Sequence, residues 1–233
     1  MKKIAVVIPC YKVGNALQSV IENIGDEVTN IFCVDDNCPD ESWKIAESLR
    51  HKDSRIVIIR RETNGGVGAA VISGYKAALD VNAEIVVKID GDGQMSPKLI
   101  PSFIKPIYEN RADYVKGNRF YHLKSLSGMP FVRILGNSIL SFVSKLSSGY
   151  WDLFDPTNGY TAIHGKVLRM LPLEEVNERF FFESDMLFRL STIRAVVKNI
   201  PIDSIYKDEK SNLRIFDVLL TFLLGVGFCT IIL

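Results

Sequence analysis

The chain has 233 residues, of which 47% are hydrophobic and 24% are charged, and its net charge at pH 7 is +1. A chain of this length can bury a substantial core as one domain. The near-neutral charge provides no overall field for nucleic acid, so we expect no nucleic-acid partner. The cysteines form no CxxC pair and have no histidines at zinc spacing, which favours free thiols in a reducing compartment. These are Cys10, Cys33, Cys38 and Cys229.

The first half of the chain alternates β-like runs with helical patterns. Strands are predicted at 3–8, 29–34, 55–60 and 84–89, and helices at 16–24, 40–49 and 67–80. This alternation is typical of a mostly parallel sheet with helices on both faces. The second helix is expected to begin at Pro39-Asp40-Glu41, because proline suits the first turn and acidic groups favour the positive helix end. The short apolar run before Pro9 is interpreted as a strand, not a signal peptide.

The second half is predicted to contain fewer strands. A helix is expected from Ser96-Pro97 toward Asn110, and a strand at 113–116. Apolar residues at helical spacing predict an amphipathic helix over 131–146. The polar stretch 155–165 is expected to be a loop, and 179–193 combines an aromatic run with a helical pattern. Residues 203–214 are charged and lack periodicity, which indicates another loop.

The carboxyl end of the chain is apolar. Residues 218–233 carry no charge and, with Ile215 and Phe216, approach the roughly 20 apolar residues that span a bilayer. A buried core helix is the alternative, but a segment apolar on every face has little to pack against at a chain end. We therefore predict a folded domain at 1–214 and a transmembrane helix at 215–233 that ends as if truncated. Basic residues within 207–214 favour a cytoplasmic location for the folded domain.

Asp90-Gly91-Asp92-Gly93-Gln94 directly follows the predicted strand at 84–89. A strand that ends in Asp-x-Asp holds two oxygen ligands at the sheet edge where α/β proteins bind ligands. Flanking glycines let a bulky anion approach the backbone. Mg²⁺ and Mn²⁺ prefer oxygen ligands and bridge carboxylates to phosphates, so the motif indicates a metal site for a phosphorylated substrate. A polar turn is the alternative. An EF-hand is excluded, because Met95 and Pro101 occupy the required glycine and glutamate positions.

Other predicted strand ends also carry polar or glycine-rich motifs. Val34-Asp35-Asp36-Asn37 places two carboxylates side by side, where one can bind a base or ribose, or form an Asx turn before the next helix. Asn64-Gly65-Gly66-Val67-Gly68 begins a helix, where backbone N–H groups can bind phosphate or the glycines can allow close helix–sheet packing. It is neither a dinucleotide fingerprint, since Val71 occupies the third glycine position, nor a P-loop.

In combination these motifs resemble the family 2 glycosyltransferases, whose nucleotide-binding α/β fold is called GT-A. The resemblance implies a mostly parallel central sheet flanked by helices, with a C-terminal membrane helix. Gln94 and the apolar end resemble the polyprenyl-phosphate group, to which dolichol-phosphate mannosyltransferases belong. Lys12-Val13 departs from the family's Asn-Glu, whose glutamate usually contacts the nucleotide. The matching segments are Val6-Val7-Ile8-Pro9-Cys10-Tyr11, Val34-Asp35-Asp36-Asn37 with Asp40, Asn64-Gly65-Gly66-Val67-Gly68-Ala69-Ala70 and Asp90-Gly91-Asp92-Gly93-Gln94.

The resemblance also implies roles for individual residues. A UDP- or GDP-linked sugar would contact Pro9, Tyr11, Asp36, Asn64, Gly68, Asp90 and Asp92. Asp90, Asp92 and Gln94 would organise Mg²⁺ or Mn²⁺ and the diphosphate, with Asp92 essential for catalysis. Gly117-Asn118-Arg119 resembles the family's Gly-Ser-Arg segment, so Arg119 and Arg133 would hold a lipid phosphate. Alternatively, each arginine is an exposed or salt-bridged residue. Lys210-Ser211 resembles a family loop with its residues permuted.

The implied activity is that of a membrane-attached, metal-dependent, inverting glycosyltransferase. It would move a sugar from a nucleotide diphosphate to undecaprenyl or dolichyl phosphate. Asp155-Pro156-Thr157-Asn158-Gly159-Tyr160 and Phe182-Glu183-Ser184-Asp185 would mark the acceptor side. The alternative is a glycan-elongating enzyme with a sugar hydroxyl acceptor and Glu183 or Asp185 as general base. Either carboxylate could instead merely position other groups or cap the helix that follows. A non-catalytic nucleotide-sugar-binding subunit is a third interpretation. The sequence leaves open the sugar and the oligomeric state, a homo-oligomer included.

Overall fold

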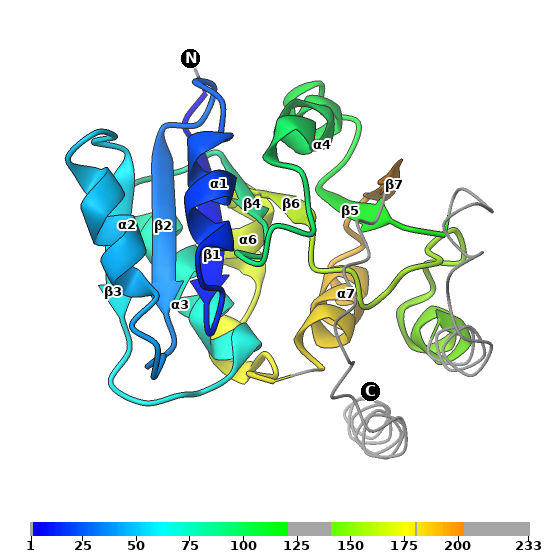
Figure 1. Cartoon of the computed structure of the whole chain (residues 1–233). Helices are drawn as coiled ribbons and strands as arrows, with labels where there is room; N and C mark the ends of the chain where they lie inside the picture. The colour runs from blue at the N-terminus through cyan, green and yellow to red at the C-terminus, as the bar shows by residue number, and fades with distance from the viewer. Residues whose placement is uncertain (1, 121–140, 180, 203–233) are drawn as a thin grey trace.

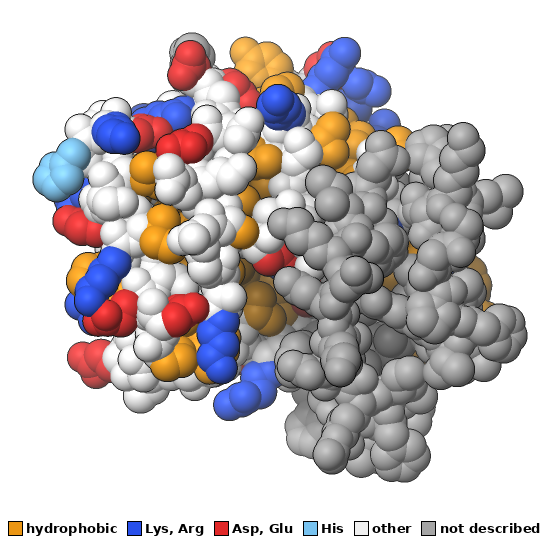
Figure 2. All heavy atoms as spheres, in the orientation of Figure 1, with side chains coloured by type: hydrophobic (Ala, Val, Ile, Leu, Met, Phe, Trp, Pro, Cys, Tyr) orange, Lys and Arg blue, Asp and Glu red, His pale blue; other side chains and the backbone are white. Residues whose placement is uncertain are grey.

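A seven-stranded sheet with helices on both faces forms the centre of the protein (Figure 1). The computed structural model describes residues 2–120, 141–179 and 181–202. The strand order is β3-β2-β1-β4-β6-β5-β7. On the face drawn in Figure 2, acidic and basic side chains are interspersed wherever the residues are coloured, in keeping with a net charge of +1.

The first half of the chain folds as the alternating pattern predicts. The strands are β1 (Ile4–Cys10), β2 (Asn30–Asp35), β3 (Ile56–Arg60) and β4 (Ile85–Lys88), and they pair in parallel. The helices between them are α1 (Ala16–Glu22), α2 (Trp43–Arg50) and α3 (Val67–Asp80). Parallel strands end at a common edge, so this half brings the polar strand ends together.

The predicted start of α2 is wrong. The helix begins at Trp43, three residues after the predicted position. Glu41 has a positive φ of 53°, a left-handed conformation that a right-handed helix cannot contain. The Asp40 carboxylate accepts a hydrogen bond from the Ser42 hydroxyl, at 2.7 Å, within the preceding loop.

The second half adds three strands and makes the sheet mixed. These are β5 (Tyr114–Asn118), β6 (Thr161–His164) and β7 (Val197–Pro201). β6 lies between β4 and β5 and is antiparallel to both, whereas β5 and β7 are parallel. The prediction of a loop over 155–165 is therefore wrong for its last part, which forms β6 and leads into α6 (Gly165–Met170). A four-residue strand is too short to show a clear period.

The other predicted helices are confirmed with narrower limits. A 3₁₀ turn, η1 (Pro97–Leu99), leads into α4 (Ile100–Tyr108), and α7 spans Phe182–Thr192. A second 3₁₀ turn, η3, spans Leu173–Glu175. Residues 141–148 are helical, while the rest of the helix predicted at 131–146 lies outside the described residues, as do 203–214 and 215–233. Within the described ranges, no helix is both long and apolar enough to cross a membrane.

Two hydrophobic layers enclose the sheet. Alternate residues of β1 face opposite sides: Val6 and Ile8 pack with α1, α2 and α4, and Val7 packs with α3, α6 and α7. Because both faces are covered, β1 is buried along its whole length, which explains its continuous apolar sequence. Cys10, Cys33 and Cys38 are buried free thiols, as predicted for these three.

Candidate active site

A cleft of about 480 Å³ opens at the carboxyl ends of β1, β2 and β4. It is lined by six of the residues that the sequence suggested for donor binding, together with Lys12 and Arg179, which it did not suggest. Pro9 and Asp92 lie 83 positions apart in the sequence, and they meet because β1 is the neighbour of β4 in a parallel pair. The six are Pro9, Tyr11, Asp36, Asn64, Asp90 and Asp92.

The Asp90 to Gln94 segment is both a turn and part of the cleft lining. The Gln94 N–H donates to Asp92 Oδ1 at 2.9 Å, and Gly93 has a φ of 76°, which glycine adopts without strain. Asp90, Gly91 and Asp92 line the cleft, but Gln94 is not among the lining residues. The two interpretations of this motif therefore do not exclude each other, since the turn presents both carboxylates at the cleft.

Lys88, at the end of β4, is a deeply buried charge beside the cleft. Its side chain is 1% exposed, and its Nζ lies 2.9 Å from Asp90 Oδ1 and 3.1 Å from Glu183 Oε1. Burial alone would lower the pKa of Lys88, but the two carboxylates hold that pKa above its ordinary value. The lysine is therefore charged, and it joins the strand end of the first half to α7.

Gly159 lets the Asp155 to Tyr160 segment pack directly on this ion pair. A Cβ at position 159 would lie 2.4 Å from Lys88 Nζ and 2.5 Å from Asp90 Oδ2. Only a residue without a side chain fits this position. The conformation of this segment is thus tied to the Lys88–Asp90 contact.

A row of polar residues crosses three strands below α7. Lys88 and Lys116 are both in register with Thr161 of the intervening strand β6. Lys116 is fully buried, and its Nζ donates to the Asn158 carbonyl at 2.5 Å. Burial lowers the pKa of Lys116 to about 8, and the Glu183 carboxylate acts in the opposite direction. The row puts two cations inside an otherwise apolar layer, with Glu183 as a shared counter-charge.

Asp36 holds the glycine-rich loop at the other wall of the cleft. Its oxygens accept hydrogen bonds from the N–H groups of Gly65, at 3.0 Å, and Gly66, at 2.7 Å. Arg61 Nε lies 2.9 Å from Asp36 Oδ1 as an ion pair, although without the alignment of a hydrogen bond. The Asn64 side chain donates to the Asp36 carbonyl at 3.1 Å. Asp36 thus fixes the loop, and it also lines the cleft.

Gly68 lies where α3 meets the loop at 177–179. A Cβ at this position would lie 2.6 Å from the Asn177 carbonyl oxygen, and the Ala69 N–H donates to the Glu178 carbonyl at 3.0 Å. Close packing therefore accounts for this glycine, against a loop and not against the sheet. Gly68 is not among the cleft-lining residues. The same packing brings Arg179 to the cleft.

The two carboxylates at the start of α7 have different partners. Glu183 pairs with Lys88, whereas Asp185 Oδ2 accepts a hydrogen bond from the Asn177 N–H at 2.7 Å. Arg189 Nε lies 3.2 Å from Asp185 Oδ1. Helix capping does not describe these carboxylates, because α7 begins without a side-chain cap. Asp185 instead positions the loop that carries Arg179.

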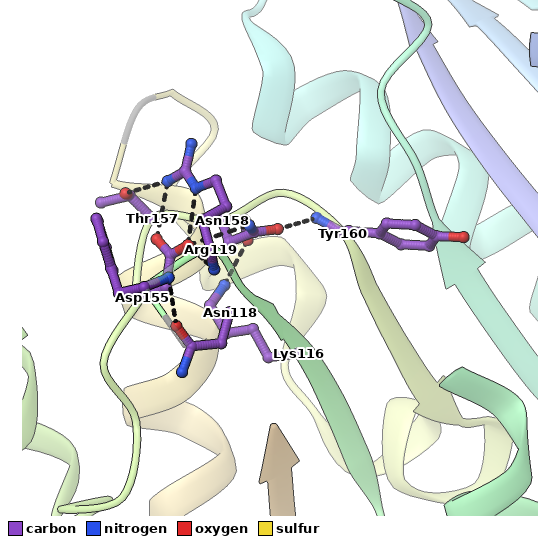
Figure 3. Close-up of polar contacts among 8 residues, drawn as sticks. Lys116, Asn118, Arg119, Asp155, Thr157, Asn158 and Tyr160 are labelled. Atoms are coloured by element: carbon purple, nitrogen blue, oxygen red, sulfur yellow. Dashed lines mark hydrogen bonds and ion pairs between the residues drawn. The ribbon is translucent and has the colours of Figure 1, made fainter. Parts of the chain in front are cut away.

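Arg119 follows β5 and binds Asp155 with two parallel contacts (Figure 3). Its Nε donates to Asp155 Oδ2 at 2.7 Å and its Nη2 donates to Oδ1 at 2.8 Å. Asp155 is buried and also accepts from the Asn158 side chain at 3.1 Å. Burial would raise the pKa of Asp155, but Arg119 holds it below its ordinary value. The structure thus places Arg119 in a structural pair; Arg133 and Lys210-Ser211 lie outside the described residues.

Comparison with known proteins fits this geometry. The model of the family Glycosyl transferase family 2 matches residues 5–171. This chain belongs to that family. Its fold is that of the family 2 glycosyltransferases, a GT-A-like sheet flanked by helices, and the predicted enzyme class is confirmed.

Two curated relatives of this glycosyltransferase span nearly its whole length. One, from Methanococcus voltae, is named UDP-N-acetylglucosamine–dolichyl-phosphate N-acetylglucosaminyltransferase; it is 30% identical over 89% of this chain and 87% of its own length. Another, the undecaprenyl-phosphate mannosyltransferase of Micrococcus luteus, is 25% identical over 88% of this chain and 85% of its own. Each of these relatives is named for a polyprenyl phosphate, dolichyl phosphate in one and undecaprenyl phosphate in the other.

A solved structure of similar fold is the glucosyl-3-phosphoglycerate synthase of Mycobacterium tuberculosis, in complex with Mn²⁺, UDP and phosphoglyceric acid. It aligns with a TM-score of 0.69 over 98% of this chain and 78% of its own. The sequence identity is 18%, so this likeness concerns the fold alone.

The residues of the cleft fit a divalent cation that a diphosphate helps to bind. Among the residues that the structure describes, no three His, Cys, Asp or Glu side chains gather as a metal site. Mg²⁺ bound with substrate phosphates commonly takes only one or two protein carboxylates. Asp90 and Asp92 supply two such carboxylates in the lining of one cleft.

Replacing Lys88 tests the buried ion pairs. We expect Lys88→Met to lower the free energy of unfolding by about 3–5 kcal/mol, because it leaves the Glu183 carboxylate buried without its cation. Urea denaturation measures this change. The matched control is Lys76→Met, whose ammonium pairs with exposed Glu174 and should contribute less than about 1 kcal/mol. Lys88→Met with Glu183→Gln should recover much of the loss. Equal destabilisation by the two single variants would refute this account.

Lys116 should make stability depend on pH. Its folded pKa, about 8, lies below the ordinary 10.5, so the unfolded chain binds more protons between these values and stability rises with pH there. We expect Lys116→Met to remove this rise. Urea denaturation of both chains at about pH 8 and about pH 10 gives the difference, in which the other titrating groups cancel. Parallel pH profiles would contradict the prediction.

Proposed function

We propose that this chain is a membrane-attached, metal-dependent, inverting glycosyltransferase that moves a sugar from a UDP- or GDP-linked donor to a polyprenyl phosphate. The observation that carries the proposal is the presence of Asp90 and Asp92 together in the lining of a cleft at the strand ends. The names of the curated relatives support undecaprenyl or dolichyl phosphate as the acceptor class.

The two walls of the cleft suit the two parts of a nucleotide sugar. On one side Tyr11, 44% exposed, offers an aromatic face to a base, near the polar groups of Asp36 and Asn64. On the other, Asp90 and Asp92 would hold a divalent cation that neutralises the charge developing on the leaving diphosphate. Lys12 and Arg179 line the same cleft, and two basic side chains there favour an anionic ligand.

The environment of the acceptor-side carboxylates favours a phosphate acceptor over a hydroxyl acceptor. A sugar hydroxyl has to lose a proton as it attacks, whereas a lipid phosphate is already anionic. Glu183 is paired with Lys88, and Asp185 is bonded to Asn177 and Arg189. Both candidate bases therefore already have structural partners. Attack by a phosphate oxygen opposite the leaving group inverts the anomeric carbon without a general base.

Membrane attachment in this proposal comes from the sequence. The segment 215–233, uncharged from residue 218 onward, would cross the bilayer, and the basic residues within 207–214 would keep the folded domain on the cytoplasmic side. A lipid acceptor would then be presented beside the domain that uses it.

Asp92→Asn tests the donor site. We expect this change to reduce transfer on the order of a hundredfold or more, because the carboxylate that would bind the cation is lost. Membranes carrying the full chain are offered a panel of radiolabelled nucleotide sugars with Mg²⁺ or Mn²⁺, and lipid-extractable product is counted. Asp80→Asn, an exposed carboxylate at the end of α3, is the control. Near-normal turnover of Asp92→Asn would contradict the role of Asp92 in binding the divalent cation. Donor binding without turnover in the native chain would support a non-catalytic subunit.

Glu183→Gln separates the phosphate acceptor from the glycan-elongating alternative. With a phosphate acceptor we expect kcat of the folded variant to fall less than about tenfold, because no base is needed and Asp90 still pairs with Lys88. A hydroxyl acceptor that used Glu183 as base would lose on the order of 10²–10⁴ in rate. Asp185→Asn is measured in the same way. A water-soluble product together with the larger loss would establish the alternative.

A further inference from the structure

The helix at 141–148 has its polar and apolar faces reversed relative to an ordinary surface helix. Its buried residues are Ser141, Ser144 and Ser148, whereas Phe142 is 55% exposed and Leu146 is 58% exposed. Positions 142 and 146 lie one turn apart, so they share a face. A soluble surface helix normally turns such an apolar stripe toward the core. This outward stripe needs a partner other than water.

The chain that follows, which accepts a hydrogen bond from Ser141 of the helix at the Leu153 carbonyl, at 3.4 Å, carries two more exposed aromatic residues. After a turn at Gly149, which has a φ of 72°, Trp151 is 56% exposed and Phe154 is 55% exposed. Lys145 Nζ lies 3.6 Å from the centre of the Phe154 ring, so this ring lies against the helix. We define the exposed apolar patch as Phe142, Leu146, Trp151 and Phe154. A cation over one of its rings gives the patch both apolar and basic character.

The exposed apolar patch lies on the acceptor side of the molecule. Phe154 directly precedes Asp155, which binds Arg119. The last described residue, Ile202, donates its N–H to the Asn118 carbonyl at 3.1 Å, so the chain leaves the described fold beside Arg119, 13 residues before the apolar sequence begins at 215. The helix at 141–148 lies on the same side as β5 and α7, away from α2 and β3 (Figure 1). The patch, Arg119 and the exit of the chain thus share one region.

We propose that the exposed apolar patch inserts into the interfacial region of a lipid bilayer. The proposal rests on the proposed function for the lipid acceptor, and it adds the surface that meets the lipid. Tryptophan is enriched at the membrane–water interface, and lysine keeps its charge at the headgroups while its stem lies in the apolar layer. Lys145 over the Phe154 ring matches that arrangement and suits anionic headgroups. A face between two copies of the chain would instead gain from the absence of a central charge.

Insertion of the exposed apolar patch would place the site at the depth of the acceptor phosphate. Side chains of a patch adjoining Arg119 would hold the active-site region at headgroup depth, where the phosphate of a polyprenyl lipid lies. The transmembrane sequence alone would tether the domain without fixing its orientation. The patch would supply that orientation.

The two tryptophans of the chain, Trp43 and Trp151, allow a local test. Trp43→Phe leaves Trp151 as the only emitter in the full-length protein, reconstituted in vesicles of phosphatidylcholine and phosphatidylglycerol. We expect blue-shifted emission and roughly twofold quenching by acyl-chain-brominated phosphatidylcholine, because an interfacial indole reaches the lipid tails. The matched control is Trp151→Phe, which leaves Trp43, on α2 under Arg60, without quenching.

A second variant and a second measurement keep the test decisive. Phe142→Ser with Leu146→Ser, in the Trp43→Phe background, should reduce the quenching of Trp151 severalfold and leave donor binding unchanged. Unquenched Trp151 in a protein that still sediments with vesicles would overturn the inserted patch and leave the proposed function standing. Quenching of Trp151 without any lipid-linked product would overturn the proposed function and leave the inserted patch standing. A blue shift that depends on protein concentration in lipid-free detergent would assign the patch to a second copy and overturn the proposal.

Discussion

The site depends on one buried positive charge. Lys88 has no access to water, so its ammonium is tolerated only because carboxylates reach it from two directions. Asp90 comes from the same strand end, and Glu183 comes from a helix almost a hundred residues later in the chain. Because both carboxylates meet on one ammonium, this charge ties the end of β4 to α7.

Similar buried carboxylates hold the rest of the rim. Asp36 fixes the glycine-rich loop, Asp185 fixes the loop that carries Arg179, and Asp155 fixes Arg119. In each case a carboxylate accepts backbone or guanidinium hydrogen bonds in a place that water does not reach. The rim is therefore preorganised by charge-assisted hydrogen bonds, and the apolar layers on either side of the sheet supply the rigid support beneath it.

The first half of the fold could be predicted from sequence, because each strand and helix there has a clear period and each motif follows a strand directly. The donor-contact roles of the cleft residues from Pro9 to Asp92 came from the family resemblance, and these residues meet because parallel strands end together. β6 and β7 were missed because one is very short and the other is a partly exposed edge strand. The contact of Glu183 with Lys88 was unpredictable, since these residues lie far apart in the sequence, whereas Asp185 and Arg189 are four residues apart on one helix. Lys88 did leave a signal, a lysine within an apolar strand.

The position of β6 has a consequence for how the chain is made. The edge of β4 that pairs with β6 cannot form its hydrogen bonds until β6, which begins at Thr161, has left the ribosome. That is roughly 70 residues of synthesis, or about 4–15 s at ordinary rates. During this interval one edge of the sheet is open and the Lys88 ammonium is still hydrated. The Lys88 ammonium can lose its hydrating water only after Glu183 has been made. The candidate active site is therefore among the last parts of the protein to exclude water.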